Sequence, residues 1–248
     1  MKIERVSKSF GGLRALDEIS MSVYDDQVAI LMGPNGSGKT TLNNVIAGVY
    51  KPESGNVSFR AIDITGWPPH EVFRVGLVRT FQIPSPLTNL SVLENLIVAR
   101  GTNPGEGFLR FPFHRYWLGY EKDSVEFAFK VLALLKLESR WDAKASELSG
   151  GETKLLEIGR ALMSGAKMIL MDEPVSGVNP TLAHEILAHI VGLRKDLGIA
   201  FLLIEHRLDI ALQYVDYAFV MSRGRVISEG KVSDVLADPN VITAYLGS

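Results

Sequence analysis

The sequence predicts an α/β fold that is interrupted by a helical insertion. Short apolar segments with the character of buried strands alternate with helical patterns up to residue 83, and this alternation resumes after residue 166. The residues between these two stretches show helical periodicity. We therefore expect an α/β core made of residues 1–83 and 166–248, and a helical subdomain made of residues 84–165.

Length and composition narrow the classes of protein to consider. The chain has 248 residues, enough for one large domain or two closely joined ones. Its net charge is −2, whereas general nucleic-acid binding requires an excess of basic residues, so we expect no nucleic-acid partner. The chain has no cysteine, which excludes disulfides and thiolate metal sites. Glu4 lies where a signal peptide would be apolar, and no run approaches the roughly 18 apolar residues of a membrane span, so we expect a soluble protein.

The expected elements follow from local patterns. Lys2–Val6 and Ile19–Tyr24 have strand character on either side of a turn at Gly11–Gly12, and Phe10 before that turn is either a core residue or an exposed aromatic. Asn56–Phe59 predicts a short edge strand. The other expected elements are a helix at Pro69–Val75, a strand at Gly76–Thr80, and insertion helices at Ser91–Ala99, Glu121–Leu137 and Glu152–Met163.

One segment of the insertion, residues 101–120, is rich in glycine and then in aromatic residues. The aromatic residues are Phe108, Phe111, Phe113, Tyr116, Trp117 and Tyr120. Such a density predicts either a satellite hydrophobic cluster or a contact with a partner, and we favour the cluster.

The strongest functional signal is a glycine-rich turn between a predicted strand at Val28–Met32 and a predicted helix at Lys39–Ala47. The turn fits the pattern G-x-x-x-x-G-K-[ST] in the strand–loop–helix context that this pattern requires. Its residues are Gly33, Pro34, Asn35, Gly36, Ser37, Gly38, Lys39, Thr40 and Thr41.

This turn predicts a cradle for nucleotide phosphates. Its glycines let successive backbone N–H groups point at a polyanion, and the start of the following helix adds positive potential. Lys39 would reach the β- and γ-phosphates, and the Thr40 hydroxyl would bind Mg²⁺. The alternative is a turn that only ends a strand, which the correct flanking elements make the weaker interpretation.

A second buried strand, Met168–Glu173, ends in two carboxylates, Asp172 and Glu173. Beside a phosphate loop, Asp172 would bind Mg²⁺, directly or through water, and Glu173 would orient and polarise the attacking water. The alternative is an acidic strand end that leads into a turn at Pro174.

A possible second anion site precedes the predicted helix Glu152–Met163. The segment consists of Leu148, Ser149, Gly150, Gly151 and Glu152. Ser149 and Glu152 have the spacing of a capping box, but two glycines in a first turn cost about 1 kcal/mol each relative to alanine. They would let an anion approach the helix start closely, so the capping and phosphate-binding interpretations are compatible.

Together these motifs resemble those of the ATP-binding subunits of ABC transporters, over nearly the whole chain. The resemblance implies a RecA-like P-loop NTPase core with an antiparallel β edge, and an inserted helical subdomain that carries the signature at residues 148–152. It matches Phe10 to the aromatic that stacks on adenine, Gln82 to the Q-loop, and His206 to the switch histidine. The D-loop would be Ser176, Gly177, Val178 and Asn179.

The resemblance also implies roles for these residues. The catalytic set would be Lys39, Gln82, Glu173 and His206, and the Mg²⁺ ligands would be Thr40, Gln82 and Asp172. The signature of one subunit would complete the ATP site of a partner in a head-to-tail dimer. The implied cofactors are ATP and Mg²⁺.

Finer strings favour one branch of the family, the larger ATPase of branched-chain amino acid importers. These strings are Val78–Gln82, Leu90–Asn95, Glu205–Asp209 and Ala244–Gly247. Urea-importer and lipopolysaccharide-exporter ATPases are near relatives. Two residues depart from the family pattern: Glu152 replaces the usual Gln of the signature, and Asn179 replaces the usual Asp of the D-loop.

Membership of this branch implies a peripheral subunit on the cytoplasmic face of the cell membrane. Its partners would be a second ATPase subunit, identical or related, two membrane-embedded permease subunits and, indirectly, a solute-binding protein. One alternative is an ABC ATPase that acts on DNA or ribosomes, but the long coiled-coil insertion or tandem cassettes of such proteins are missing. Another is a regulatory module that binds ATP without hydrolysing it; Glu173 and His206 argue against it, whereas Glu152 leaves it open.

Overall fold

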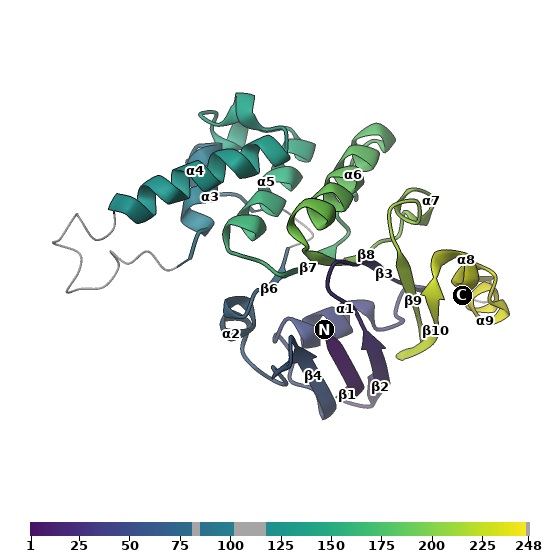
Figure 1. Cartoon of the computed structure of the whole chain (residues 1–248). Helices are drawn as coiled ribbons and strands as arrows, with labels where there is room; N and C mark the ends of the chain where they lie inside the picture. Colours follow the sequence, from purple (N-terminus) through teal and green to yellow (C-terminus); the bar gives the residue numbers. More distant parts are fainter. Residues whose placement is uncertain (81–84, 102–117, 247–248) are drawn as a thin grey trace. The chain divides into compact units, whose positions relative to one another are not determined.

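The structure, a computed structural model, describes residues 1–80, 85–101 and 118–246 (Figure 1). The chain divides into two compact units. The first unit comprises Met1–Gln82 and Lys167–Ser248, and the second comprises Ile83–Ala166. No helix within the described ranges is long and apolar enough to cross a bilayer.

The first unit is built on a six-stranded sheet with the strand order β10-β9-β3-β8-β7-β6. Neighbours from β9 to β6 are parallel, and only β10 runs antiparallel to its neighbour. The strands are β3 (Val28–Met32), β6 (Leu77–Arg79), β7 (Met168–Asp172), β8 (Ala200–Ile204), β9 (Tyr217–Ser222) and β10 (Arg225–Lys231). The carboxyl ends of β3, β7 and β8 therefore meet at one edge of the sheet.

A second, antiparallel sheet in the same unit has the order β2-β1-β4-β5. Its strands are β1 (Lys2–Phe10), β2 (Leu13–Ser22), β4 (Ser54–Phe59) and β5 (Ile62–Asp63). The predicted strands Lys2–Val6 and Ile19–Tyr24 were too short at the ends that approach the turn. The prediction that Asn56–Phe59 forms an edge strand was wrong, because β4 pairs with both β1 and β5.

Alternation along the strands separates two apolar faces of the six-stranded sheet. Leu31, Leu202 and Phe219 belong to the main core, which also includes residues of the four-stranded sheet and of α1 (Lys39–Ile46). On the same strands, Ile30 and Leu203 alternate with these residues and are buried, and α6 (Pro180–Leu197) packs on β3 and β8. The other helices of this unit are α2 (Pro69–Arg74), α7 (Leu208–Ala211), α8 (Val232–Leu236) and α9 (Pro239–Leu246).

The second unit is helical and contains α3 (Val92–Ala99), α4 (Leu118–Leu134) and α5 (Gly150–Met163). These three helices pack on one another around buried residues that include Leu96, Val131 and Ile158. Two 3₁₀ turns, Glu138–Arg140 and Ala145–Glu147, connect α4 to α5. Of the aromatic residues in the segment 101–120, only Tyr120 lies within the described residues, so the predicted cluster stays a prediction.

Candidate functional site

The phosphate loop begins where β3 ends. All five residues of β3 are buried, and the backbone then turns through Gly33 and Gly38 with positive φ values of 149° and 104°. A Cβ atom on Gly33 would lie 2.1 Å from the Met221 carbonyl oxygen, and one on Gly38 would lie 2.6 Å from that of Ala15. Only glycine fits at these two positions. Gly38 is the N-cap of α1 and has no side chain, so the first N–H groups of the helix receive no side-chain cap there.

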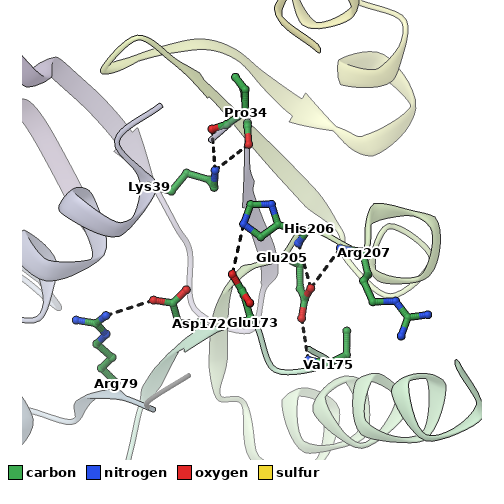
Figure 2. Close-up of polar contacts among 10 residues, drawn as sticks. Pro34, Lys39, Arg79, Asp172, Glu173, Val175, Glu205, His206 and Arg207 are labelled. Atoms are coloured by element: carbon green, nitrogen blue, oxygen red, sulfur yellow. Dashed lines mark hydrogen bonds and ion pairs between the residues drawn. The ribbon is translucent and has the colours of Figure 1, made fainter. Parts of the chain in front are cut away.

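Lys39, the first residue of α1, folds back over the loop. Its Nζ donates hydrogen bonds to the carbonyl oxygens of Gly33 (2.7 Å) and Pro34 (3.0 Å), as Figure 2 shows. The residue is only 6% exposed. Burial lowers the pKa of the Lys39 ammonium, and the nearby carboxylates of Asp172 and Glu173 oppose this shift. A cation is thus held at the loop, facing two acidic residues.

Asp172 is the last residue of β7 and is 9% exposed. Its Oδ2 lies 3.3 Å from Nη2 of Arg79, the last residue of the neighbouring strand β6 (Figure 2). Nη1 of Arg79 donates to Oδ1 of Asn44 in α1 at 2.5 Å. The Arg79 side chain therefore joins the phosphate-loop helix to the acidic end of β7.

Glu173 and His206 face each other across the carboxyl ends of β7 and β8. Nε2 of His206 lies 3.4 Å from Oε1 of Glu173 (Figure 2). The Glu173 backbone has a positive φ of 52°, an uncommon conformation for a residue with a side chain, and its N–H donates to the Ile204 carbonyl at 2.8 Å. Strain of this kind concentrates at functional sites.

These side chains share one cavity of about 520 Å³. The predicted site residues that line it are Phe10, Asn35, Gly36, Ser37, Gly38, Lys39, Thr40, Thr41, Asp172, Glu173 and His206. Phe10 is 43% exposed and packs edge-on against Tyr50, so it is the exposed aromatic of the two alternatives. Gly33 and Pro34 do not line the cavity but bind Lys39 through their carbonyl oxygens.

Six lining residues were not predicted from the sequence: Leu13, Arg14, Ala15, Ile204, Arg223 and Gly224. Arg223 and Gly224 form the turn between β9 and β10, and both have positive φ values, as a two-residue hairpin turn requires. The Gly224 N–H donates to the Ser37 carbonyl at 3.0 Å. The pair Arg223–Gly224 between two strand-like segments could have predicted this hairpin from the sequence. It could not have predicted that the hairpin contacts the phosphate loop.

The remaining predicted residues lie elsewhere. Gln82 falls outside the described residues. Asn179 is the N-cap of α6, where its Oδ1 accepts from the Leu182 N–H at 2.9 Å, and the rest of the D-loop, Ser176–Val178, precedes it without lining the cavity.

The signature segment belongs to the second unit. Ser149 is the N-cap of α5, and a full capping box with Glu152 is present, as predicted. The hydrogen bond from the Ser149 N–H, assisted by the Ser149 side chain and by Arg140, holds the pKa of Glu152 below its ordinary value, against the effect of burial. Because Glu152 replaces glutamine without loss of the capping box, the helix start tolerates this departure from the family pattern.

The chemistry of the cavity suits a nucleotide with Mg²⁺. The Ser37 hydroxyl in the phosphate loop is buried, and no hydrogen-bond partner for it occurs within the described parts of the chain. The described residues contain no cluster of three or more acidic, His or Cys side chains that could hold a metal alone. In nucleotide sites Mg²⁺ typically uses one or two protein oxygens together with phosphates and water; here Thr40 and Asp172 can supply them.

Comparison with known proteins agrees with these features. A family model described as ABC transporter matches residues 16–176, and one described as branched-chain amino acid ATP-binding cassette transporter matches residues 225–248. A probable branched-chain amino acid transport ATP-binding protein LivG of Methanocaldococcus jannaschii is 50% identical, over 100% of this chain and 97% of the relative. The corresponding protein of Archaeoglobus fulgidus is 47% identical, over 100% and 95%.

A solved structure supports the same assignment. The crystal structure of the ADP conformation of an ATP-binding cassette of an ABC transporter matches with a TM-score of 0.85 at 49% identity, covering 100% of this chain and 98% of that one. The family predicted from the motifs is confirmed. The chain belongs to the ABC transporter family and is one of its ATP-binding, ATP-hydrolysing subunits.

Proposed function

We propose that this chain is the ATPase subunit of a branched-chain amino acid importer. Relatives that are 47–50% identical over the whole chain carry that transport function in their names, and the C-terminal residues 225–248 match a model described in the same terms. As the ATPase subunit of such an importer, it would act on the cytoplasmic face of the membrane. It would bind two permease subunits there and depend indirectly on a solute-binding protein.

The observation that carries the proposed chemistry is the cavity in which Lys39 and the phosphate loop face Asp172, Glu173 and His206. We propose that the loop N–H groups and Lys39 bind the triphosphate of ATP and that Phe10 stacks on its adenine. Thr40 and Asp172 would hold Mg²⁺, assisted by Gln82. When bound, this ion would neutralise charge on the phosphates.

In this mechanism Glu173 and His206 act on the attacking water. The Glu173 carboxylate orients that water and accepts its proton at Oε1 or Oε2 as the nucleophile forms. His206, 3.4 Å from Glu173 Oε1, fixes the position of the carboxylate and would contact the γ-phosphate. Two subunits would enclose the nucleotide head to tail, with Ser149, Gly150, Gly151 and Glu152 of each signature helix facing the partner's γ-phosphate.

A pair of variants tests the proposed ATPase site. Glu173→Gln keeps the size of the side chain but removes the base, so Mg-ATP should accumulate unhydrolysed and hold two subunits together. We expect a stable dimer by gel filtration in Mg-ATP and a monomer without it. Lys39→Ala should fail to bind Mg-ATP in a calorimeter. If Glu173→Gln stays monomeric in Mg-ATP, or if Lys39→Ala binds like the parent, the mechanism is wrong.

The importer assignment needs a separate experiment. The affinity-tagged chain should copurify with its permease from native membranes, and proteoliposomes of that complex should take up labelled leucine when ATP is supplied. Uptake of urea, or extraction of lipopolysaccharide, in place of leucine transport would assign the chain to one of the related systems. An isolated subunit that binds ATP but releases no phosphate would support the regulatory alternative.

A further inference from the structure

Two segments of the first unit meet beside the cavity. They are joined by a backbone–backbone hydrogen bond and by hydrogen bonds that involve two side chains. We call residues 173–179 the acidic loop and residues 204–207 the switch segment. A backbone hydrogen bond joins them at one end, from the Glu173 N–H to the Ile204 carbonyl at 2.8 Å. Two further bonds involve Glu205 and Arg207, the residues on either side of His206. Figure 2 draws the first of them, between Glu205 and Val175.

Glu205 is 2% exposed, which is unusual for a carboxylate. Its Oε1 accepts from the Val175 N–H at 2.8 Å, and its Oε2 accepts from the N–H groups of His206 (3.1 Å) and Arg207 (3.4 Å). No ion pair to Glu205 occurs within the described residues. The buried charge is therefore stabilised by backbone donors, and two of these donors belong to the switch segment itself.

Arg207 makes the second link. Its Nη1 donates to the carbonyl oxygen of Val178 at 2.9 Å, so the guanidinium holds the acidic loop three residues beyond the point that Glu205 holds. Figure 2 shows the Glu205 side chain directed toward Val175 and the Arg207 side chain extending away from His206. His206 points toward Glu173, at 3.4 Å.

We propose that Glu205 and Arg207 are positioning residues that hold the acidic loop and the switch segment in one fixed register. The inference rests on the proposed function, in which Glu173 and His206 act together on the water that attacks ATP. The Glu173–His206 distance depends on how the two segments are spaced, and Glu205 and Arg207 set that spacing at Val175 and Val178. Movement of residues 176–179 would then be transmitted to His206.

The test uses Arg207→Met as the main variant, because Arg207 is only half-buried and the variant keeps an apolar stem of similar length. Arg207→Lys retains a donor for the Val178 carbonyl and serves as the conservative rescue. Glu205→Gln presents an amide NH₂ where N–H donors converge, so it should break part of the carboxylate's set of bonds. The matched control is Arg194→Met, which removes an arginine that pairs with Asp216 (3.0 Å) in the same unit, outside the residues that line the cavity.

Three quantities are measured on the full chain: the affinity for a fluorescent ATP analogue, kcat and KM for Mg-ATP, and deuterium uptake by peptides that cover residues 173–179. For Arg207→Met and Glu205→Gln we expect unchanged nucleotide affinity, faster uptake in that peptide and a kcat lowered by about 10- to 100-fold, because small displacements of reacting groups cost this much. Arg207→Lys should recover most of the activity. Arg194→Met should match the parent in all three measurements.

Each outcome decides the inference. Unchanged kcat in Arg207→Met overturns it, whether or not deuterium uptake changes. Loss of nucleotide affinity together with kcat also overturns it, since the residue would then serve binding or folding. If Glu205→Gln does not fold, the comparison of Arg207→Met with Arg207→Lys still tests the inference. If the parent chain itself fails to hydrolyse Mg-ATP, the proposed function fails, and unchanged deuterium uptake in Arg207→Met would separately refute the structural link.

Discussion

Arg79 connects two elements of the candidate site, β7 and α1. Its guanidinium contacts Asp172 at the end of β7 and Asn44 in α1. The Asp172 side chain is 10% exposed and that of Arg79 is 19% exposed. A carboxylate with so little access to water needs cations or hydrogen-bond donors nearby, and here Arg79 and Lys39 are nearby cations. Before Mg²⁺ binds, Arg79 is thus a principal partner of the proposed metal ligand.

Replacing Arg79 should destabilise the protein most when Mg²⁺ is absent. Arg79→Met leaves the Asp172 carboxylate without its hydrogen-bonded cation, so we expect the free energy of unfolding to fall by about 1–3 kcal/mol in urea with EDTA. Arg79→Lys keeps the positive charge but cannot contact Asp172 and Asn44 through two separate nitrogens. Its free energy of unfolding should therefore fall by less than that of Arg79→Met. Excess Mg-ATP should restore part of the loss in the Met variant. Equal stability of parent and Arg79→Met in EDTA would contradict this account.

Site residues could be predicted from the sequence where they belong to one continuous motif. Lys39 and Thr40 lie within the phosphate loop, and Asp172 and Glu173 end a run of apolar residues, so local spacing identifies them. Arg79 and Glu205 could not be identified in this way, because their partners lie 93 and 30 residues away. They meet because β6 and β8 both pair with β7, and this strand order is not encoded in any short stretch of sequence.

At the scale of the element, the start of α5 contains an acidic residue, Glu152, that both caps the helix and forms an ion pair. Glu152 accepts from the Ser149 N–H at 2.8 Å and lies 3.4 Å from Arg140 Nε. The side chain is about one-third exposed, so solvent weakens both interactions. The hydrogen bonds still hold the pKa of Glu152 below its ordinary value. The charged form therefore stabilises the folded state more than the protonated form does.

This pKa shift predicts a pH dependence. A depressed carboxyl pKa adds stability that is complete above the unfolded-state pKa of about 4.3 and is lost as the pH falls through the folded-state pKa. Glu152→Gln lacks this contribution at every pH. We therefore expect the parent to melt above Glu152→Gln at pH 6, with the difference shrinking toward pH 3.5. Since other carboxylates titrate in both proteins, only the difference between the two melting temperatures is informative; a difference independent of pH would refute the prediction.

Strands and helices were predictable to the extent that burial leaves a local pattern. β3 matches the predicted Val28–Met32, because all its residues are buried. β7 ends at Asp172, one residue before the predicted end of its strand at Glu173, because the Glu173 backbone adopts a positive φ of 52°. The ends of β1 and β2 that approach the turn have no apolar alternation and were missed; apart from Ser7 and Leu16 their residues are partly or fully exposed. The predicted helix Glu121–Leu137 ends early, at Leu134, because Lys136 adopts a left-handed φ of 55° and the Leu137 N–H bonds the Leu132 carbonyl. Apolar residues continue beyond the end of the helix, so the sequence pattern does not show where it ends.

Within the first unit as a whole, segments near both ends of the chain hold the phosphate loop. Gly224, in the turn between β9 and β10, donates to the Ser37 carbonyl at 3.0 Å and accepts from the Asp17 N–H at 2.8 Å. A Cβ atom at Gly224 would lie 2.9 Å from the Ala15 carbonyl oxygen. One turn thus connects β2, the phosphate loop and the C-terminal hairpin, so the geometry of the loop depends on residues almost 190 positions away in the chain.

Gly224→Ala should therefore weaken nucleotide binding without a change in any predicted ligand. Its φ of 77° is strained for alanine, at about 1–3 kcal/mol, and the methyl group would press on the Ala15 carbonyl and shift the turn from Ser37. We expect calorimetry to show an affinity for Mg-ATP lowered by about tenfold, equivalent to about 1.4 kcal/mol. Gly165→Ala is the matched control: Gly165 has a φ of 80° but no atom within 4 Å of its Cβ position, so alanine there adds strain alone. Both variants should melt below the parent, whereas only Gly224→Ala should bind ATP more weakly; equal affinities would show that the hairpin turn does not shape the phosphate loop.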